Sequence, residues 1–219
     1  MSIIFYSGTK NASSWALRAW LALKEADIAF EERVVDIRQP QRFANLKQIA
    51  EFSPPGAVPV LVVGEAVIFD SLAIMEYAND LGGGELLPRD LKERACARSL
   101  VAWQHSGLSG LCHRLSFESS FYSDRRAMTQ EEMSQSERIF RVCESQLKNS
   151  GGPYLFGSLS LVDLAFVPTA IRLIAHAATL DPWPLTKKWT EEVLRRDSVQ
   201  EWLHDAYSLP VVRLSDYFP

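Results

Sequence analysis

Cysteine is scarce in this sequence, with three residues in a chain of 219. Cys96, Cys112 and Cys143 are widely spaced, form no C-x-x-C pair and have no histidine at metal-ligand spacing. This pattern argues against a disulfide scaffold and against a zinc site. Each cysteine falls in a segment with helical patterning, where we expect a buried thiol that acts as a small apolar side chain. No resident metal is predicted.

Long apolar runs and basic clusters are missing as well. No run approaches the length of about 20 apolar residues that spans a bilayer, and the start of the chain lacks the features of a secretory signal. The formal net charge is −4 and no run of lysine and arginine is longer than two, which argues against nucleic acid or an anionic membrane as a partner. We therefore expect a cytoplasmic protein with no nucleic-acid and no membrane partner.

The first 80 residues show strand and helix patterns in turn. Short β-prone runs mark four strands, and apolar residues at helical spacing mark three helices. The order β-α-β-α-β-β-α contains one crossover pair and one antiparallel pair, which is the thioredoxin-like plan. The strands are predicted at residues 2–6, 30–37, 58–63 and 66–70, and the helices at residues 13–23, 39–51 and 71–81.

The rest of the chain has helical patterning and no convincing strand. A glycine-rich segment that ends in proline, residues 81–88, is predicted to be a linker. We therefore predict an α+β protein, with a thioredoxin-like domain at residues 1–80 and an all-helical domain at residues 89–219. The helices of the second domain are predicted at residues 89–120, 129–149, 160–178 and 187–206.

Three stretches resemble the glutathione-binding block of the glutathione transferases: residues 54–61 (PPGAVPVL), Phe69-Asp70 and residues 71–77 (SLAIMEY). The order of the two domains is similar too, and the resemblance covers nearly the whole chain. It is closest to the bacterial and zeta-like classes, which begin the first helix with Ser or Cys. The resemblance implies glutathione as cosubstrate, no metal, and a homodimer.

The resemblance also implies how glutathione is held. In the family the bond that corresponds to Val58–Pro59 is cis, so that the backbone of Val58 pairs with the cysteinyl part of glutathione, and a cis bond before proline costs only about 0.5–1 kcal/mol. Asp70-Ser71 opens a helix, with Ser71 suited to the N-cap or the first turn. By resemblance Ser71 and its backbone amide hold the γ-glutamyl carboxylate, and Asp70 or a neighbouring residue balances the amino group.

The family places the hydroxyl or thiol that acts on the glutathione sulfur at the start of the first helix, where Ser13 falls in this sequence. A hydroxyl donor and the positive end of a helix both favour thiolate over thiol, so Ser13 is assigned the catalytic role as a hydrogen-bond donor. Two alternatives stay open. Tyr6 ends the first strand, where some mammalian classes place an activating tyrosine, and Ser14 is the neighbouring hydroxyl.

Other positions have no settled role. Asn11 replaces the serine of zeta-like proteins, and Gly56-Ala57 lacks the lysine or glutamine often found before the Val-Pro, which leaves the anchor of the glycine end unassigned. Trp103 and His113 lie in helices that usually line the pocket for the second substrate; the alternative is that they belong to the core. The motif Ser160-x-x-Asp163 is a capping-box variant before an apolar run, and we assign it to structure.

The predicted function is the conjugation of glutathione to small apolar electrophiles, a detoxification activity. A glutathione-dependent isomerase or peroxidase needs the same activated thiolate, and a non-catalytic glutathione-binding or regulatory member would keep the fold without turnover. A disulfide oxidoreductase is less consistent with the sequence, because no cysteine lies at the first helix. The fold alone does not decide among these functions.

Overall fold

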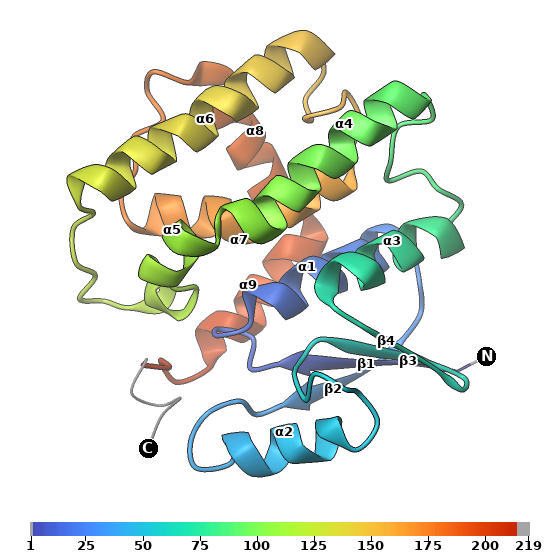
Figure 1. Cartoon of the computed structure of the whole chain (residues 1–219). Coiled ribbons are helices and arrows are strands. Elements are labelled where there is room, and N and C mark those ends of the chain that lie inside the picture. The colour runs from blue at the N-terminus through green and yellow to red at the C-terminus, as the bar shows by residue number, and fades with distance from the viewer. Residues whose placement is uncertain (1, 214–219) are drawn as a thin grey trace. The chain divides into compact units, whose positions relative to one another are not determined.

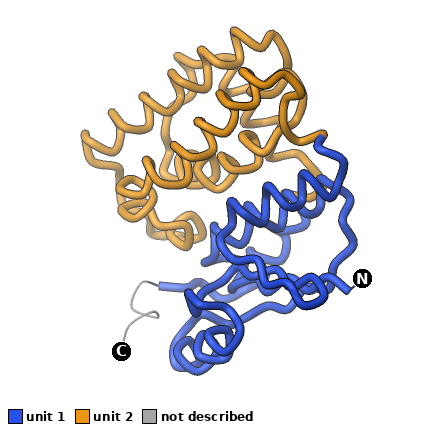
Figure 2. Tube along the Cα trace, turned by 45° about the vertical axis from the view of Figure 1, so that its right-hand side comes forward, with its two compact units in different colours: residues 1–84, 201–219 blue, residues 85–200 orange. Residues whose placement is uncertain are grey.

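A computed structural model describes residues 2–213 of the chain. These residues divide into two compact units (Figure 2). The N-terminal unit contains residues 2–84 together with 201–213, and the helical unit contains residues 85–200.

The end of the chain differs from the prediction, which placed everything from residue 89 onward in the helical domain. From Glu201 onward the chain groups with the N-terminal unit. The physical reason is aromatic packing, because the rings of Trp20 and Trp202 meet edge to face with centroids 5.5 Å apart.

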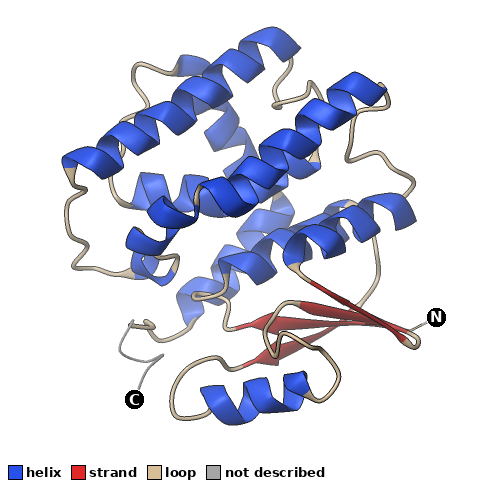
Figure 3. Ribbon diagram, in the orientation of Figure 1, coloured by secondary structure: helices blue, strands red, loops and turns tan. Residues whose placement is uncertain are grey.

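Four strands form the mixed sheet of the N-terminal unit (Figure 3). β1 runs parallel to β2 and antiparallel to β3, and β3 and β4 form a hairpin, so the strand order is β2-β1-β3-β4. This topology confirms the predicted thioredoxin-like arrangement. The strands are β1 (Ile3–Gly8), β2 (Glu31–Val35), β3 (Val60–Val63) and β4 (Ala66–Phe69).

Helices cover both faces of this sheet (Figure 1): α1 and α3 pack side by side on one face, and α2 lies on the other. Almost the whole of α1 is buried, because it packs against the sheet at β1 and against the neighbouring helix α3. The helices of the unit are α1 (Ser14–Glu25), α2 (Arg42–Ala50), α3 (Ser71–Leu81) and the later part of α9 (Asp197–Ser208).

The helical unit is built around α7, in which every residue from Leu161 to Leu173 is buried. A helix that is apolar on all sides belongs in the middle of a domain. The described residues of this unit form no strand, only isolated bridges. Its helices are α4 (Leu91–Ala102), α5 (Ser109–Arg114), α6 (Gln130–Ser150), α7 (Leu161–Ala175), α8 (Pro184–Leu194) and the start of α9.

Two of the predicted helices are broken. The segment 89–120 contains α4, a π-helical turn η1 (Trp103–Gly107), α5 and the start of a 3₁₀ turn η2 (Glu118–Phe121). The segment 187–206 contains the end of α8 and most of α9, which are separated at Arg195-Arg196. No helix among residues 2–213 is both long enough and apolar enough to cross a membrane.

The three cysteines lie in α4, α5 and α6, as predicted, but they are not all buried. Only Cys143 has the expected environment, and burial raises the pKa of its thiol to about 12. Cys112 is half-buried and Cys96 is exposed. The prediction of burial is therefore wrong for Cys96, because its side of α4 faces solvent.

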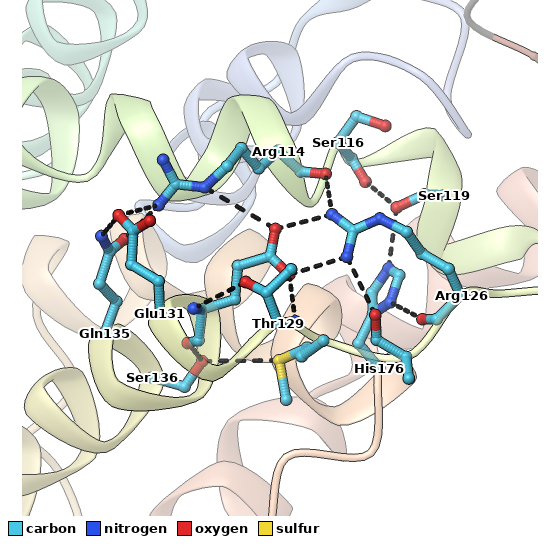
Figure 4. A network of polar contacts seen from close by, with 12 residues as sticks. Arg114, Ser116, Ser119, Arg126, Thr129, Glu131, Gln135, Ser136 and His176 are labelled. Carbon is cyan, nitrogen blue, oxygen red and sulfur yellow. Dashed lines mark hydrogen bonds and ion pairs between the residues drawn. The ribbon is translucent and has the colours of Figure 1, made fainter.

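A polar network connects α5, α6 and α7 within the helical unit (Figure 4). At its centre the carboxylate of Glu132, whose side chain is 1% exposed, accepts two hydrogen bonds from Arg126 at 2.6 and 2.7 Å. Thr129 and Glu132 form a capping box at the start of α6. His176, at the end of α7, bonds Ser119 at 2.9 Å and the backbone oxygen of Arg126 at 3.3 Å.

Candidate functional site

The loop between β1 and α1 ends at Ser13, which is the N-cap of α1. Its Oγ accepts a hydrogen bond from the backbone N–H of Ala16 at 3.4 Å, and the residue is only 5% exposed. Ser13 therefore occupies the helix N-terminus that was predicted for it, where the free N–H groups of the first turn favour negative charge.

Gly8 brings Ser13 close to Val58. A Cβ atom at residue 8 would lie 3.0 Å from the Oγ of Ser13 and 3.0 Å from Cγ2 of Val58. The two side chains therefore converge over Gly8, and any larger residue would push them apart. The sequence did not single out Gly8, although the turn Ser7-Gly8-Thr9 marks the end of the strand.

The Val58–Pro59 bond is cis, as the resemblance implied. A second cis bond, Gln39–Pro40, was not anticipated. Val58 lies two residues before β3 and close to Ser13, in the segment for which a backbone role in holding glutathione is predicted.

Asp70, not Ser71, is the N-cap of α3. Its Oδ1 accepts from the backbone N–H of Leu72 at 2.7 Å, and its φ is +72°. Asp70 is exposed, whereas Ser71 is the first helical residue and is buried. The two positions predicted for Ser71 are the N-cap and the first turn, and the structure places it in the first turn.

Arg18 lies beside Ser71 and was not predicted as a site residue. Its Nη2 donates to the Oγ of Ser71 at 2.9 Å, and its guanidinium lies 4.0 Å from the ring of Trp15. Arg18 is 2% exposed and Trp15 43% exposed. A buried guanidinium beside a helix N-terminus suits a carboxylate ligand. The one signal in the sequence is that Arg18 is the only charged residue in an otherwise apolar run.

The two alternatives to Ser13 have different surroundings. The hydroxyl of Tyr6 accepts from Nη1 of Arg33 at 3.2 Å, and its ring lies 5.2 Å from that of Phe52. Ser14 is the first residue of α1 and is buried. Because successive residues are about 100° apart on a helix, Ser13 and Ser14 project in different directions.

Asn11 is buried in the same loop, where its Nδ2 donates to the backbone oxygen of Pro210 at 2.8 Å. Its role is therefore to hold the loop against the C-terminal segment. Gly56 has a positive φ of +55° and an added Cβ would lie 3.1 Å from that of Ala50, so glycine suits the turn before Val58. No anchor for the glycine end of glutathione is identified by these contacts.

The candidate residues of the helical unit have separate environments. Trp103 packs its ring against Phe166, with centroids 6.0 Å apart, and the guanidinium of Arg138 lies 5.8 Å from it. His113 is exposed on α5. Their contact with a second substrate stays a prediction.

Asp163 is fully buried at the start of α7, as its structural assignment requires. It accepts from the backbone N–H of Leu155 and Ser160, from the hydroxyl of Ser160 and from Nε1 of Trp189, at 2.6–2.9 Å. Burial raises the pKa of this carboxyl, although the four donors act in the opposite direction. The contacts to Leu155 and Trp189 had no signal in the sequence.

Among residues 2–213 no group of three or more His, Cys, Asp or Glu side chains is placed to hold a metal ion.

Comparison with known proteins gives the same family for both parts of the chain. Residues 12–81 match the model of the glutathione S-transferase N-terminal domain, and residues 114–206 match that of the C-terminal domain. Glutathione S-transferase 1 of Dianthus caryophyllus is 30% identical over 87% of this chain and 86% of the relative. A probable maleylacetoacetate isomerase of Caenorhabditis elegans is 30% identical over 86% of each.

Solved structures are similar over nearly the whole chain. A glutathione S-transferase I bound with lactoylglutathione is 26% identical and matches 94% of this chain and 100% of its own, with a TM-score of 0.76. A Burkholderia glutathione transferase homologue with bound glutathione matches 96% of this chain and 100% of its own at 24% identity, with a TM-score of 0.69. The second of these likenesses concerns the fold alone.

Proposed function

Because the chain belongs to the glutathione S-transferase family, we propose that it transfers glutathione to small apolar electrophiles, with Ser13 as the donor to the glutathione sulfur. The observation that carries this assignment is the position of Ser13 at the N-cap of α1, next to Val58 and the cis bond to Pro59.

Ser13 acts by stabilising the thiolate, and it takes no proton in this mechanism. A thiol pKa lowered by about two units from about 8.5 corresponds to roughly 2.7 kcal/mol. One charge-assisted hydrogen bond contributes about 1.5–3 kcal/mol, and the helix N-terminus adds a smaller amount of the same sign. The thiol proton goes to solvent, and the thiolate then attacks the electrophilic carbon of the second substrate. The new C–S bond forms as a leaving group departs with its bonding pair, or as the pair of a conjugated double bond moves to its acceptor group and is protonated from solvent.

The start of α3 binds the γ-glutamyl end of glutathione. Ser71 and the free N–H groups of the first turn donate hydrogen bonds to the γ-glutamyl carboxylate. Arg18 supplies a positive charge 2.9 Å from the Ser71 hydroxyl. Asp70 is exposed and pairs with the amino group. The backbone of Val58 holds the cysteinyl part, which places the sulfur near Ser13.

Other parts of the proposal rest on the family. We infer a homodimer in the cytoplasm, with a detoxification role, with Trp103 and His113 as contacts of the apolar electrophile, and without nucleic-acid or membrane partners. The relative named glutathione S-transferase and the solved structure with lactoylglutathione support the cosubstrate.

The test is the affinity for glutathione, measured by calorimetry. Ser71→Ala and Asp70→Ala should each raise the dissociation constant about tenfold, since each removes a contact to a charged group of the ligand. Asp90→Ala is the matched control, because Asp90 caps α4 in the same way, accepting from Lys92 at 2.9 Å. Wild-type affinity in both Ser71→Ala and Asp70→Ala would contradict the proposed site.

Isomerisation is the second candidate function, favoured by the relative named as a probable maleylacetoacetate isomerase. It uses the same thiolate but regenerates glutathione in each cycle. A cis–trans assay with a maleyl substrate separates the two reactions, since conjugation consumes glutathione and isomerisation does not. Tight binding of glutathione without either turnover would indicate a non-catalytic member.

A further inference from the structure

The loop that carries Ser13 also carries a buried lysine, Lys10. Its ammonium group contacts Asp205 at 2.7 Å and Glu32 at 3.1 Å, and its side chain is only 9% exposed. A cation in this position needs compensation for the water that it loses. The proposed chemistry at Ser13 does not use this charge.

Two indole rings complete the surroundings of Lys10. The ammonium nitrogen lies 5.4 Å from the ring of Trp20 and 5.1 Å from that of Trp202, both within cation–π range. Burial disfavours the charged form, but the hydrogen bond to Asp205 and the attraction of Glu32 outweigh it, and the pKa of Lys10 is raised above its ordinary value. Lys10 is therefore a fixed cation at neutral pH.

These contacts fix the loop from three directions. Trp202 donates from Nε1 to the backbone oxygen of Lys10 at 3.0 Å. Helix α9 therefore contacts both the backbone and the ammonium group of Lys10. Glu32 belongs to β2, where its other oxygen accepts from Ser7 at 2.6 Å. Trp20 belongs to α1 itself.

Backbone hydrogen bonds of Thr9, the residue before Lys10, connect this part of the loop to Ser13. The carbonyl of Thr9 accepts from the backbone N–H groups of Ala12 and Ser13, both at 2.9 Å. The hydroxyl of Thr9 bonds Asp36 at 3.2 Å and accepts from Ile37 at 3.1 Å. Asp36 is itself paired with Arg38, so Glu32 and Asp205 are the carboxylates that face Lys10.

We propose that Lys10, held by Glu32, Asp205 and the two indole rings, is a positioning residue that sets the place of Ser13 and so the ionisation of bound glutathione. The inference rests on the proposed function. It assigns a role to the C-terminal segment as well, because α9 supplies two of the four groups around the ammonium.

The measurement is the pH dependence of thiolate absorbance for glutathione bound to each variant. Lys10→Met should raise the apparent thiol pKa by about one unit, a roughly tenfold loss of thiolate at pH values below it. Lys10→Arg keeps the charge and can keep the cation–π contacts to the indoles, and it should recover most of the wild-type value. At a pH well below the thiol pKa of bound glutathione, where its ionisation does not contribute to binding, the dissociation constant is governed by α3 and should change less than twofold, which also shows that each variant is folded.

Lys24→Met is the matched control. Lys24 contacts the same Trp20 ring at 5.1 Å and pairs with Glu201 of the same helix α9 at 2.8 Å, but it lies at the other end of α1. Its loss removes contacts of the same kinds, one ion pair to α9 and one cation–π contact to Trp20, and should leave the thiol pKa unchanged.

Asp205→Asn distinguishes positioning from a simple effect of charge. If Asp205 acts only through its electrostatic field, removing its negative charge should lower the thiol pKa. If Asp205 acts by holding Lys10 and the loop in place, its loss should displace Ser13 and raise the thiol pKa. A higher thiol pKa in Asp205→Asn supports the proposal, and a lower one overturns it. Unchanged values in both Lys10→Met and Asp205→Asn, with a shift in Ser13→Ala, would overturn this inference alone; absence of bound thiolate in the wild type would overturn the proposed function with it.

Discussion

Single residues decide the chemistry of the β1–α1 loop, and Ser13 has the most specific test. Ser13→Ala should raise the apparent thiol pKa of bound glutathione by about one to two units, because one hydrogen-bond donor to the thiolate is lost. Thiolate absorbance as a function of pH measures this shift.

Ser14→Ala and Tyr6→Phe are the controls for Ser13→Ala. Ser14 is turned about 100° around the helix, and the Tyr6 hydroxyl is bonded to Arg33, so neither substitution should change the thiol pKa. A rise confined to Tyr6→Phe would make the phenol the donor and remove Ser13 from the catalytic role.

The residues that could be predicted at this scale are those with local signals. The roles of Ser13, Val58 and Asp70 are implied by resemblance to short family motifs and stay predictions, whereas their places at a helix start or before a strand have local signals in the sequence. Lys10 and Arg18 were missed because their partners are distant in the chain: Asp205 is 195 positions from Lys10, and Ser71 is 53 from Arg18. No local pattern contains such a pairing.

At the scale of elements, the start of α7 depends on Asp163. Asp163→Ala should lower the free energy of unfolding by about 3 kcal/mol, since it leaves buried donors of Leu155, Ser160 and Trp189 without an acceptor, each costing about 1–3 kcal/mol when unsatisfied. Urea unfolding measures the loss, and glutathione affinity should not fall specifically.

Asp90→Ala gives the matched comparison for Asp163→Ala. Asp90 also accepts from two N–H groups at a helix start, those of Lys92 and Glu93, but it is exposed. The loss of such a cap costs about 1 kcal/mol, because water replaces the carboxylate. Equal losses in the two variants, or weaker glutathione binding with unchanged stability in Asp163→Ala, would contradict the structural assignment.

Element boundaries show the limit of pattern reading. The strands and α3 were predicted because turns or caps mark their ends in the sequence. The break between α8 and α9 falls at Arg195-Arg196, where no glycine or proline interrupts the helical periodicity. There the packing of α9 with Trp20 decides the path of the chain, and tertiary contacts override local propensity.

For the molecule as a whole, the Glu132 network determines part of the response to acid. The hydrogen bonds from Arg126 lower the pKa of Glu132 from 4.5 to about 2. A carboxylate with a depressed pKa in the folded state stabilises it above the unfolded pKa, and that contribution disappears as the pH falls from about 4.5 to about 2. The shift corresponds to about 3 kcal/mol.

Other buried carboxyls act with the opposite sign. Burial raises the pKa values of Asp163 and Glu118, so protonation of these groups favours the folded state as the pH falls. The acid profile of the wild type alone therefore cannot isolate Glu132, and a variant must be compared with it at each pH.

Glu132→Gln should lower the free energy of unfolding by about 3 kcal/mol at pH 7 and by progressively less toward pH 3, since the glutamine has no charge to lose. Urea unfolding at several pH values gives the slope. Glu131→Gln is the matched control: Glu131 is the preceding residue of α6, and it pairs with Arg114 at 3.3 Å while its side chain is 69% exposed. Its pair is worth under about 1 kcal/mol, so this variant should keep the wild-type slope. If the two substitutions flattened the profile equally, the network around Glu132 would not be the source of the acid response.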